Sequence, residues 1–193
     1  MITGAILAGG YSKRFGKNKA FVQLGEKKLI ERIIDIIKPL FDDILIVSNS
    51  AEEYEFTGCP VIRDALPVKG PLVGIYSALL ASKNTYTFIA ACDMPFINPR
   101  LIAYMIEKKK GYDIIVPSVE ENKLEPLHAL YSKKCLPYIK NKISIHAKRV
   151  ISFYPDLLVY TVKKNEIVQY DPKFLSFYNI NTNEDFKKSR QFL

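Results

Sequence analysis

The chain has 193 residues, of which 48% are hydrophobic and 25% are charged, a composition typical of a soluble globular domain with a full core. Its net charge is +8, but the lysines stand in short clusters without interleaved aromatic residues or a binding motif, which argues against a nucleic-acid partner. No apolar run is long enough to span a membrane, no signal-peptide pattern opens the chain, and three scattered cysteines make neither a disulfide framework nor a zinc site, so we expect a cytoplasmic protein without a membrane partner.

The first predicted strand is the apolar run Thr3–Ala8, and the loop that follows it is rich in glycine and positive charge. In an open parallel sheet, phosphates bind at the carboxyl end of such a strand. Gly9 and Gly10 allow a tight turn that presents backbone N–H groups to an anion, and Arg14 and Lys19 add two positive charges. The spacing is neither that of a P-loop nor that of the dinucleotide fingerprint, so the alternatives are a triphosphate site of another kind or an ordinary turn.

Helices and strands alternate through the first 117 residues. The predicted helices are Lys28–Leu40, Pro71–Ser82 and Pro99–Lys110, and the further strands are Asp43–Ser48, Pro60–Arg63, Tyr86–Ala91 and Asp113–Pro117. Because the strands are continuously apolar and are joined by helices, they predict an α/β fold with a mostly parallel central sheet covered on both faces.

The pattern after residue 117 is less regular. We expect extended segments at Leu127–Tyr131, Leu157–Thr161 and Phe177–Ile180, and helices at Lys133–Asn141 and Ser144–Ser152. A last helix is expected to begin at Thr182, with Asp185 three residues later completing a capping box.

A second candidate site residue, Asp93, stands in the string Cys92-Asp93-Met94-Pro95 directly after the predicted strand Tyr86–Ala91. Asp93 therefore lies at the carboxyl tip of a strand, at the same edge of the sheet as the glycine-rich loop. A carboxylate there suits Mg²⁺ bound to phosphates, because Mg²⁺ takes oxygen ligands and needs few from the protein. The alternative is an aspartate that only caps the next helix.

A third candidate, Asp64, follows the predicted strand Pro60–Arg63 and precedes the segment Gly70-Pro71-Leu72-Val73-Gly74. A carboxylate can accept both the N1–H and the N2–H of guanine, a planar paired contact that discriminates well between bases. Glycines at 70 and 74 would let the backbone approach the ring closely. The alternative is a turn between a strand and a helix, in which proline and glycine are ordinary.

Together these strings resemble the sugar-nucleotide-type nucleotidyltransferases, and among them the molybdenum cofactor guanylyltransferases. The matching patterns are L-A-G-G-x-S-x-R-x-G-x-x-K from residue 7, D-x-x-x-x-x-G-P-L-x-G from residue 64, C-D-M-P from residue 92, P-L-h-A-L-Y from residue 126 and N-x-N-T-x-E-D from residue 179. Val68, Asn18 and Asn183 replace residues that are common in the family. The resemblance implies a three-layer Rossmann-like nucleotidyltransferase fold in one domain, residues 1–193, with a nucleotide-binding half of about 1–99 and an acceptor-binding half of about 100–193.

The resemblance also assigns roles to residues. It implies that Arg14, Lys19 and Asp93 are catalytic, that Asp93 binds Mg²⁺, and that the nucleotide is bound by Leu7, Ala8, Gly9, Gly10, Lys19, Asn49, Asp64, Gly74 and Asp93. Asn179 and Asn181 are the residues expected at the acceptor, with assistance to the metal as the alternative role of Asn181. His128 lies within an apolar run and is expected to be packed in the core rather than to act as a base.

The reaction implied by the resemblance is transfer of GMP from GTP to the terminal phosphate of molybdopterin carrying molybdenum, with pyrophosphate as the second product. Cofactor-delivery proteins of the same pathway are then possible partners. Residues 100–193 hold 17 Lys and Arg against 10 Asp and Glu, which favours an anionic acceptor unless these lysines only form a solvated surface. The alternatives are a cytidylyltransferase for the molybdenum cofactor or for an isoprenoid or sugar phosphate, and a regulatory module that binds nucleotide without turnover.

Overall fold

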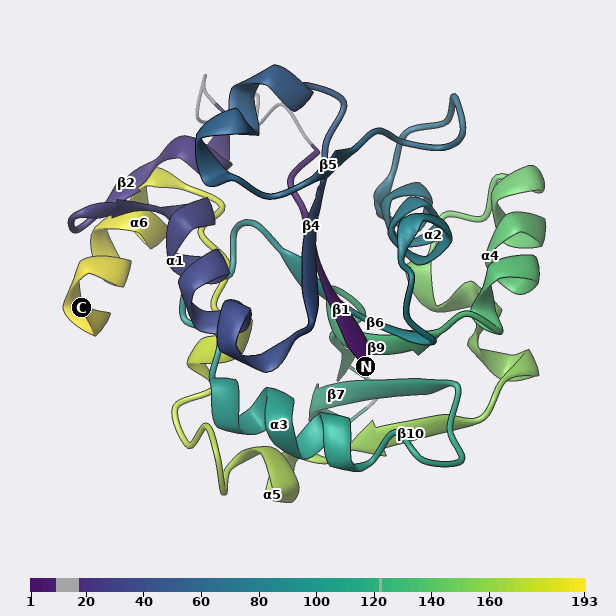
Figure 1. Ribbon diagram of the computed structural model, residues 1–193. Helices are drawn as coiled ribbons and strands as arrows, with labels where there is room; N and C mark the ends of the chain where they lie inside the picture. Colours follow the sequence, from purple (N-terminus) through teal and green to yellow (C-terminus); the bar gives the residue numbers. More distant parts are fainter. Residues whose placement is uncertain (10–17, 122) are drawn as a thin grey trace.

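The computed structural model describes residues 1–9, 18–121 and 123–193, and Figure 1 shows its elements. The strands are β1 (Ile2–Leu7), β2 (Gln23–Leu24), β3 (Lys27–Lys28), β4 (Asp43–Val47), β5 (Val61–Ile62), β6 (Tyr86–Ala91), β7 (Ile114–Glu120), β8 (Lys123–Leu124), β9 (His128–Ser132) and β10 (Val159–Val162). The α-helices are α1 (Leu29–Ile37), α2 (Pro71–Ala81), α3 (Pro99–Glu107), α4 (Cys135–Ser144), α5 (Lys164–Ile167) and α6 (Asn183–Ser189). Short 3₁₀ helices are η1 (Lys19–Phe21), η2 (Lys38–Leu40), η3 (Ala51–Thr57), η4 (Val150–Asp156), η5 (Leu175–Phe177) and η6 (Arg190–Phe192).

One eight-stranded sheet runs through the molecule in the order β10-β7-β9-β6-β1-β4-β5, with β8 paired to β7. β1, β4, β5 and β6 are parallel to one another, and β7 is parallel to β10, whereas β9 is antiparallel to both of its neighbours. In the centre of the sheet Ala5 of β1 pairs with Leu45 of β4 on one side and with Ile89 of β6 on the other. This register brings the carboxyl ends of β1, β4, β5 and β6 to the same edge of the sheet.

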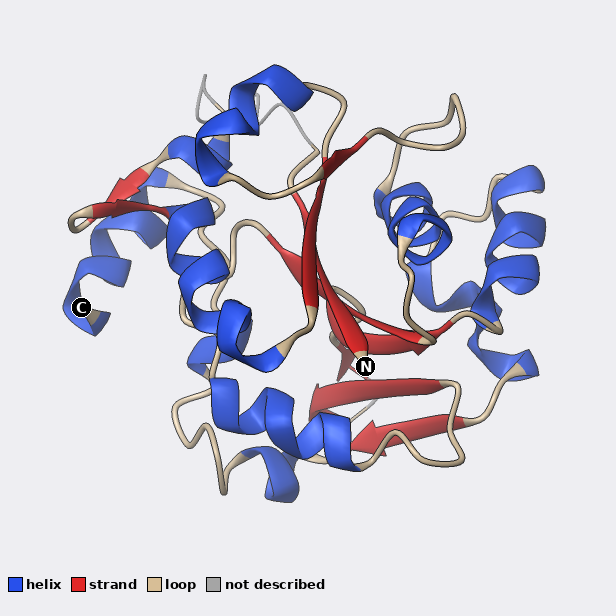
Figure 2. Ribbon diagram, viewed as in Figure 1, coloured by secondary structure: helices blue, strands red, loops and turns tan. Residues whose placement is uncertain are grey.

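Helices cover both faces of the sheet, so that the protein has three layers (Figure 2). On one face the apolar stripe of α1, which includes Ile30, Ile33 and Ile37, packs in one core with side chains of α3 and α5. On the other face α2 and α4 share a second core with η4. The middle of α2, residues 72–79, is buried throughout because this helix lies between the sheet and α4, which explains why its sequence is mostly apolar.

The expected fold class is therefore confirmed, and most element bounds agree with the expectation within a few residues. The expected strand Tyr86–Ala91 is reproduced as β6, and Thr182 caps α6 in a capping box with Asp185. No helix in the described part of the chain is both long enough and apolar enough to cross a bilayer.

Two expectations in the second half were wrong. The helix expected at Ser144–Ser152 does not form: α4 ends at Ser144, His146 adopts a left-handed backbone with φ of 53°, and η4 begins only at Val150. A left-handed residue interrupts the hydrogen-bond ladder, so a helix cannot continue through it. The segment Phe177–Ile180 joins no strand, because the end of η5 and the loop after it turn toward β6 instead of pairing with the sheet.

Candidate active site

The ends of β1 and β6 leave the sheet side by side. The backbone N–H of Cys92 donates to the carbonyl of Leu7 at 3.2 Å, and that of Ala8 donates to the carbonyl of Val47 at 3.0 Å. Ala8-Gly9 therefore lies between the ends of β4 and β6, and Asp93 follows directly beside it. The sheet register thus places the start of the glycine-rich loop and the predicted metal ligand at one edge, as expected for parallel strands.

Three predicted site residues meet there. Lys19 Nζ lies 3.4 Å from Asp93 Oδ2 and donates to Asn181 Oδ1 at 2.6 Å. The side chain of Lys19 is 15% exposed and that of Asp93 is 22% exposed, so their attraction is less screened than that of a surface pair. Asp93 is 74 positions and Asn181 is 162 positions from Lys19 in the sequence, so these contacts join segments from both halves of the chain.

Lys19 is held in place by its neighbour. Asn18 caps η1, because its Oδ1 accepts from the N–H of Ala20 at 3.2 Å, and its Nδ2 donates to the Tyr54 hydroxyl at 2.9 Å. Tyr54 in turn donates to the carbonyl of Ala8 at 2.8 Å. Burial raises the pKa of Tyr54 to about 12, so the hydroxyl keeps its proton and can donate. This link between the end of β1 and η1 was not foreseen from the sequence, since Asn18 departs from the family pattern at its position and Tyr54 belongs to no motif.

Asn181 is placed by two sets of hydrogen bonds. The N–H of Ile180 donates to the carbonyl of Asp93 at 2.9 Å, which fastens the loop after η5 to the end of β6. The carboxylate of Asp185 accepts from the N–H groups of Asn181 and Thr182 at 3.0 and 2.8 Å. A hydrogen bond with the side chain of Thr182 is the largest cause that lowers the pKa of Asp185, and the backbone N–H groups of Asn181 and Thr182 lower it further, so this anchor stays charged.

The donor set at this point fits Mg²⁺. Asp93 offers a carboxylate oxygen and Asn181 an amide oxygen, and both already face one cation, the ammonium group of Lys19. Mg²⁺ prefers such oxygen ligands and completes its octahedron with water and substrate phosphates. Among the described residues there is no group of three or more His, Cys, Asp and Glu side chains that could hold a metal, so a bound Mg²⁺ would depend on oxygens from a ligand.

Asp64 makes no hydrogen bond or ion pair with Lys19 in the described part of the chain and is paired with Asn49 instead. Asn49 Nδ2 donates to Asp64 Oδ2 at 2.8 Å, and the N–H of Asp64 donates to Asn49 Oδ1 at 3.1 Å. Asn49 follows β4 and Asp64 follows β5, so the pair bridges the ends of two neighbouring strands. It forms a second polar cluster at the same edge of the sheet.

Other predicted residues stand in different settings. Gly74 is buried in α2, and a Cβ atom there would lie 3.2 Å from the Leu7 side chain, so its lack of a side chain serves close packing of α2 on β1. Asn179 donates to the carbonyl of Phe177 at 3.2 Å. Gly10 and Arg14 lie outside the described residues.

His128 is fully buried, as expected for a core residue, and lies edge-on to Phe88 and Phe177. Burial lowers the pKa of His128 to about 3, so the imidazole is neutral at physiological pH. Neither ring nitrogen has a hydrogen-bond partner among the described residues. His128 is therefore poorly placed to exchange protons with a ligand.

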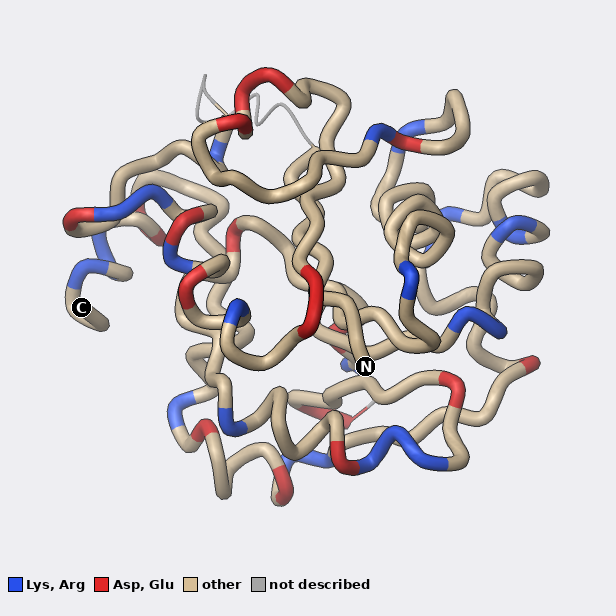
Figure 3. Tube along the Cα trace, in the orientation of Figure 1, with Lys and Arg blue, Asp and Glu red and all other residues tan. Residues whose placement is uncertain are grey.

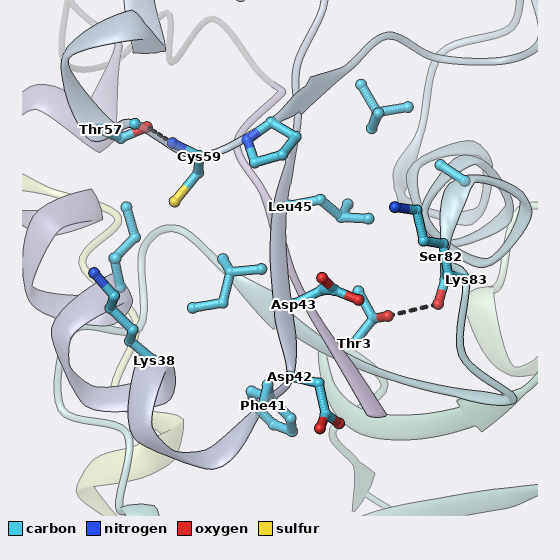
Figure 4. Close-up of a pocket in the computed structure, with 16 residues that line it drawn as sticks. Thr3, Lys38, Phe41, Asp42, Asp43, Leu45, Thr57, Cys59, Ser82 and Lys83 are labelled. Atoms are coloured by element: carbon cyan, nitrogen blue, oxygen red, sulfur yellow. Dashed lines mark hydrogen bonds between the residues drawn. The ribbon is translucent and has the colours of Figure 1, made fainter. Parts of the chain in front are cut away.

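A cavity of about 520 Å³ opens elsewhere, beside the first half of β4 (Figure 4). Its lining includes Thr3, Phe41, Asp43, Cys59 and Lys83, and none of the predicted site residues. Asp43 begins β4, whereas Asn49 and Asp93 follow the ends of their strands, so this cavity lies toward the other edge of the sheet.

The chain is similar in sequence to known proteins over almost its whole length. Residues 4–156 match the sequence model of a MobA-like NTP transferase domain. A molybdenum cofactor guanylyltransferase from Desulfosudis oleivorans is 37% identical over 190 residues, covering 97% of this chain and 94% of the relative. A protein named probable molybdenum cofactor guanylyltransferase from Natranaerobius thermophilus is 38% identical over 198 residues, covering 100% of this chain and 96% of the relative.

The fold is also similar to that of a solved structure. The crystal structure of molybdopterin-guanine dinucleotide biosynthesis protein A from Archaeoglobus fulgidus superposes with a TM-score of 0.85 at 27% identity and covers 98% of this chain and 97% of the other.

Proposed function

Because the chain belongs to the molybdenum cofactor guanylyltransferase family, with a MobA-like NTP transferase domain, we propose that it transfers GMP from GTP to the terminal phosphate of molybdopterin carrying molybdenum. The second product is pyrophosphate. The observation that supports this most is the meeting of Lys19, Asp93 and Asn181 where β1 and β6 end.

The chemistry asks mainly for electrostatic stabilisation. The acceptor phosphate attacks the α-phosphorus of GTP in line while pyrophosphate leaves, and both partners are anions. Lys19 and Arg14 hold the β- and γ-phosphate oxygens and stabilise the charge of the leaving group, and the N–H groups of Gly9 and Gly10 add to this. Asp93 would hold Mg²⁺, which would supply a Lewis acid to neutralise phosphate charge.

No covalent enzyme intermediate is required, because a phosphate monoester is already an anionic nucleophile at neutral pH. The nearest thiol, that of Cys92, is not activated: burial raises its pKa to about 12, so it stays protonated. Lys19 instead presents a positive charge where the phosphates would lie. A phosphate can replace the two side-chain oxygens that Lys19 now contacts, and those oxygens are then free to bind a metal ion.

Recognition of the two substrates is assigned to two regions. Asp64 accepts the N1–H and N2–H of guanine, with Asn49 beside it. Asn181, and with it Asn179, lies on the acceptor side, in the half of the chain with the larger positive charge. In Figure 3 the basic residues of this half are spread over several elements, which suits general attraction of an anionic acceptor better than one dedicated patch.

We place the reaction in the cytoplasm, whose reducing conditions keep thiols such as Cys59, Cys92 and Cys135 free. Delivery proteins that bring the acceptor are expected partners.

The proposal is tested by measuring the melting temperature with Mg²⁺ and each of GTP, CTP, UTP and ATP. A ligand that binds only the folded state raises the melting temperature according to its affinity. We expect a rise with GTP alone, which Asp64→Ala abolishes. A rise with CTP instead would assign the protein to the cytidylyltransferases, and no rise with any nucleotide would contradict a preformed triphosphate site.

A further inference from the structure

The Asn49 side chain forms one hydrogen bond to Asp64 in each direction. Its Nδ2 donates to the Asp64 carboxylate at 2.8 Å, and its Oδ1 accepts from the Asp64 backbone N–H at 3.1 Å. One contact requires a donor and the other an acceptor, so together they fix which way the amide group of Asn49 points. The side chain thereby ties both the backbone and the carboxylate of Asp64 to the end of β4.

The backbone next to Asp64 is fixed from a second side. The N–H of Ala65 donates to Ser77 Oγ at 2.8 Å, and that hydroxyl donates to the carbonyl of Val73 at 2.8 Å. Ser77 is buried in α2, the helix packed against the sheet. The turn at Asp64 is therefore held by a strand end and by a buried helix, while the orientation of its carboxylate is set by Asn49.

We propose that Asn49 is a positioning residue that orients the Asp64 carboxylate and so determines the preference for guanine, an inference that rests on the proposed function. A carboxylate has about four lone-pair sites, so the bond from Asn49 leaves capacity for both guanine N–H groups. Orientation matters because a paired contact requires both oxygens in the plane of the base. Without Asn49 the carboxylate can rotate and the pairing weakens.

The sensitive measure is the preference for GTP over inosine triphosphate. Inosine lacks the exocyclic amino group of guanosine and keeps N1–H. The ratio of kcat/KM, or of Kd, for GTP and inosine triphosphate therefore isolates the hydrogen bond from N2–H. A residue that touches only ribose or phosphate changes binding of both nucleotides by the same factor and leaves the ratio unchanged. A residue that acts through Asp64 changes the ratio.

The experiment compares Asn49→Ala, Asp64→Ala and the double variant, with Asn141→Ala on the exposed side of α4 as the matched control. For each, kcat/KM of transfer and Kd are measured for GTP and inosine triphosphate. We expect the wild type and Asn141→Ala to prefer GTP by roughly tenfold or more, as a good paired base contact provides. Asn49→Ala should reduce the preference to about threefold or less, and the double variant should show the same ratio as Asp64→Ala alone.

A ratio in Asn49→Ala equal to that of the wild type would overturn the inference, as would a further loss of the ratio when Asn49→Ala is added to Asp64→Ala. The binding measurement separates this from failure of the proposed function. A wild type that prefers GTP in binding but transfers no GMP would remove the proposed reaction and leave the role of Asn49 standing.

Discussion

Lys19 contacts Asp93 and Asn181 from a position at the start of η1, so a positive charge stands where two oxygen donors converge. Such an arrangement stabilises the unliganded protein by pairing a partly buried carboxylate. The two groups can also change partners, because Mg²⁺ can bind the carboxylate of Asp93 in place of Lys19, and a phosphate can bind the ammonium group of Lys19 in place of Asp93. At the scale of single residues, the same contacts therefore stabilise the folded state and, under the proposed function, would prepare the site for its substrates.

Replacing Asp93 by Asn should remove most of the activity. The variant keeps the size of the side chain but loses the charge that would hold Mg²⁺, so we expect turnover to fall at least about a hundredfold while the fold is retained. Asp35→Asn is the control, because Asp35 lies on the exposed side of α1 in a surface ion pair with Lys27. Steady-state rates and circular dichroism of both variants check this; near-wild-type turnover in Asp93→Asn would remove Asp93 from the mechanism.

Activity should also depend on free divalent metal. Chelation of Mg²⁺ with EDTA is expected to abolish transfer, and added Mg²⁺ should restore it, because the described residues offer too few ligands to retain a metal without the nucleotide. Initial rates measured against free Mg²⁺ concentration decide this. Full activity after exhaustive chelation would show that the positive side chains suffice.

His128 should make stability depend on pH. Its pKa is about 3 in the folded protein and 6.5 as a free side chain, so the unfolded chain takes up the proton first. The contribution of His128 to the free energy of unfolding is then fully present above about pH 6.5. Below that pH the free energy of unfolding falls by up to roughly 1.4 kcal/mol per pH unit. In the His128→Leu variant, stability should depend less on pH. The control is His146→Asn, which should keep the wild-type slope because His146 is exposed. The chain has only these two histidines. Urea unfolding at pH 5, 6 and 8 measures the slopes; equal slopes in wild type and His128→Leu would contradict the assignment.

At the scale of elements, short segments carry the site. η1 places Lys19 and the loop after η5 places Asn181, and polar side chains hold both segments in addition to the buried side chains of Ala20 and Ile180. The capping box at the start of α6 also holds this loop, because the carboxylate of Asp185 accepts from the N–H groups of Asn181 and Thr182.

Thr182→Ala should therefore affect function beyond its effect on stability. Loss of an N-cap costs about 1 kcal/mol, and here it also frees the loop that holds Asn181. Asn98→Ala is the control, since Asn98 caps α3 with its own side chain. Because Asn98 also donates to the carbonyl of Tyr170, we expect its replacement to lower the unfolding free energy at least as much, but a raised KM for the acceptor only in Thr182→Ala. Equal KM values in the two variants would mean that α6 has only a structural role.

Some parts of the structure could be predicted from the sequence, and others, including these segments, could not. β1, β4 and β6 were predictable because a strand buried on both faces is continuously apolar, and α1 because its apolar residues recur at helical spacing. Asp93 was predictable because it directly follows such a strand. The contact between Lys19 and Asn181 was not, since nothing local to either residue indicates a partner 162 positions away. The left-handed residue His146 ends α4 through local hydrogen bonds, from its own N–H to Ile143 and from the N–H of Ala147 to Lys142, and was not predicted because no glycine marks the position.

At the scale of the whole molecule, one sheet joins strands from both halves of the chain, with β6 and β9 pairing across the division. The two cores lie on opposite faces of that sheet, so neither half closes a core without the other. The site uses this arrangement, because Lys19 and Asp64 come from the first half and Asn181 from the second.

The most direct test of the account is product formation. Purified protein, Mg²⁺, molybdenum-loaded molybdopterin and either GTP or CTP are mixed, and the dinucleotide and pyrophosphate are quantified together. The account predicts equal amounts of molybdopterin guanine dinucleotide and pyrophosphate from GTP, little product from CTP, and almost none with Asp93→Asn. Formation of the cytosine dinucleotide in preference, or nucleotide binding without pyrophosphate release, would contradict it.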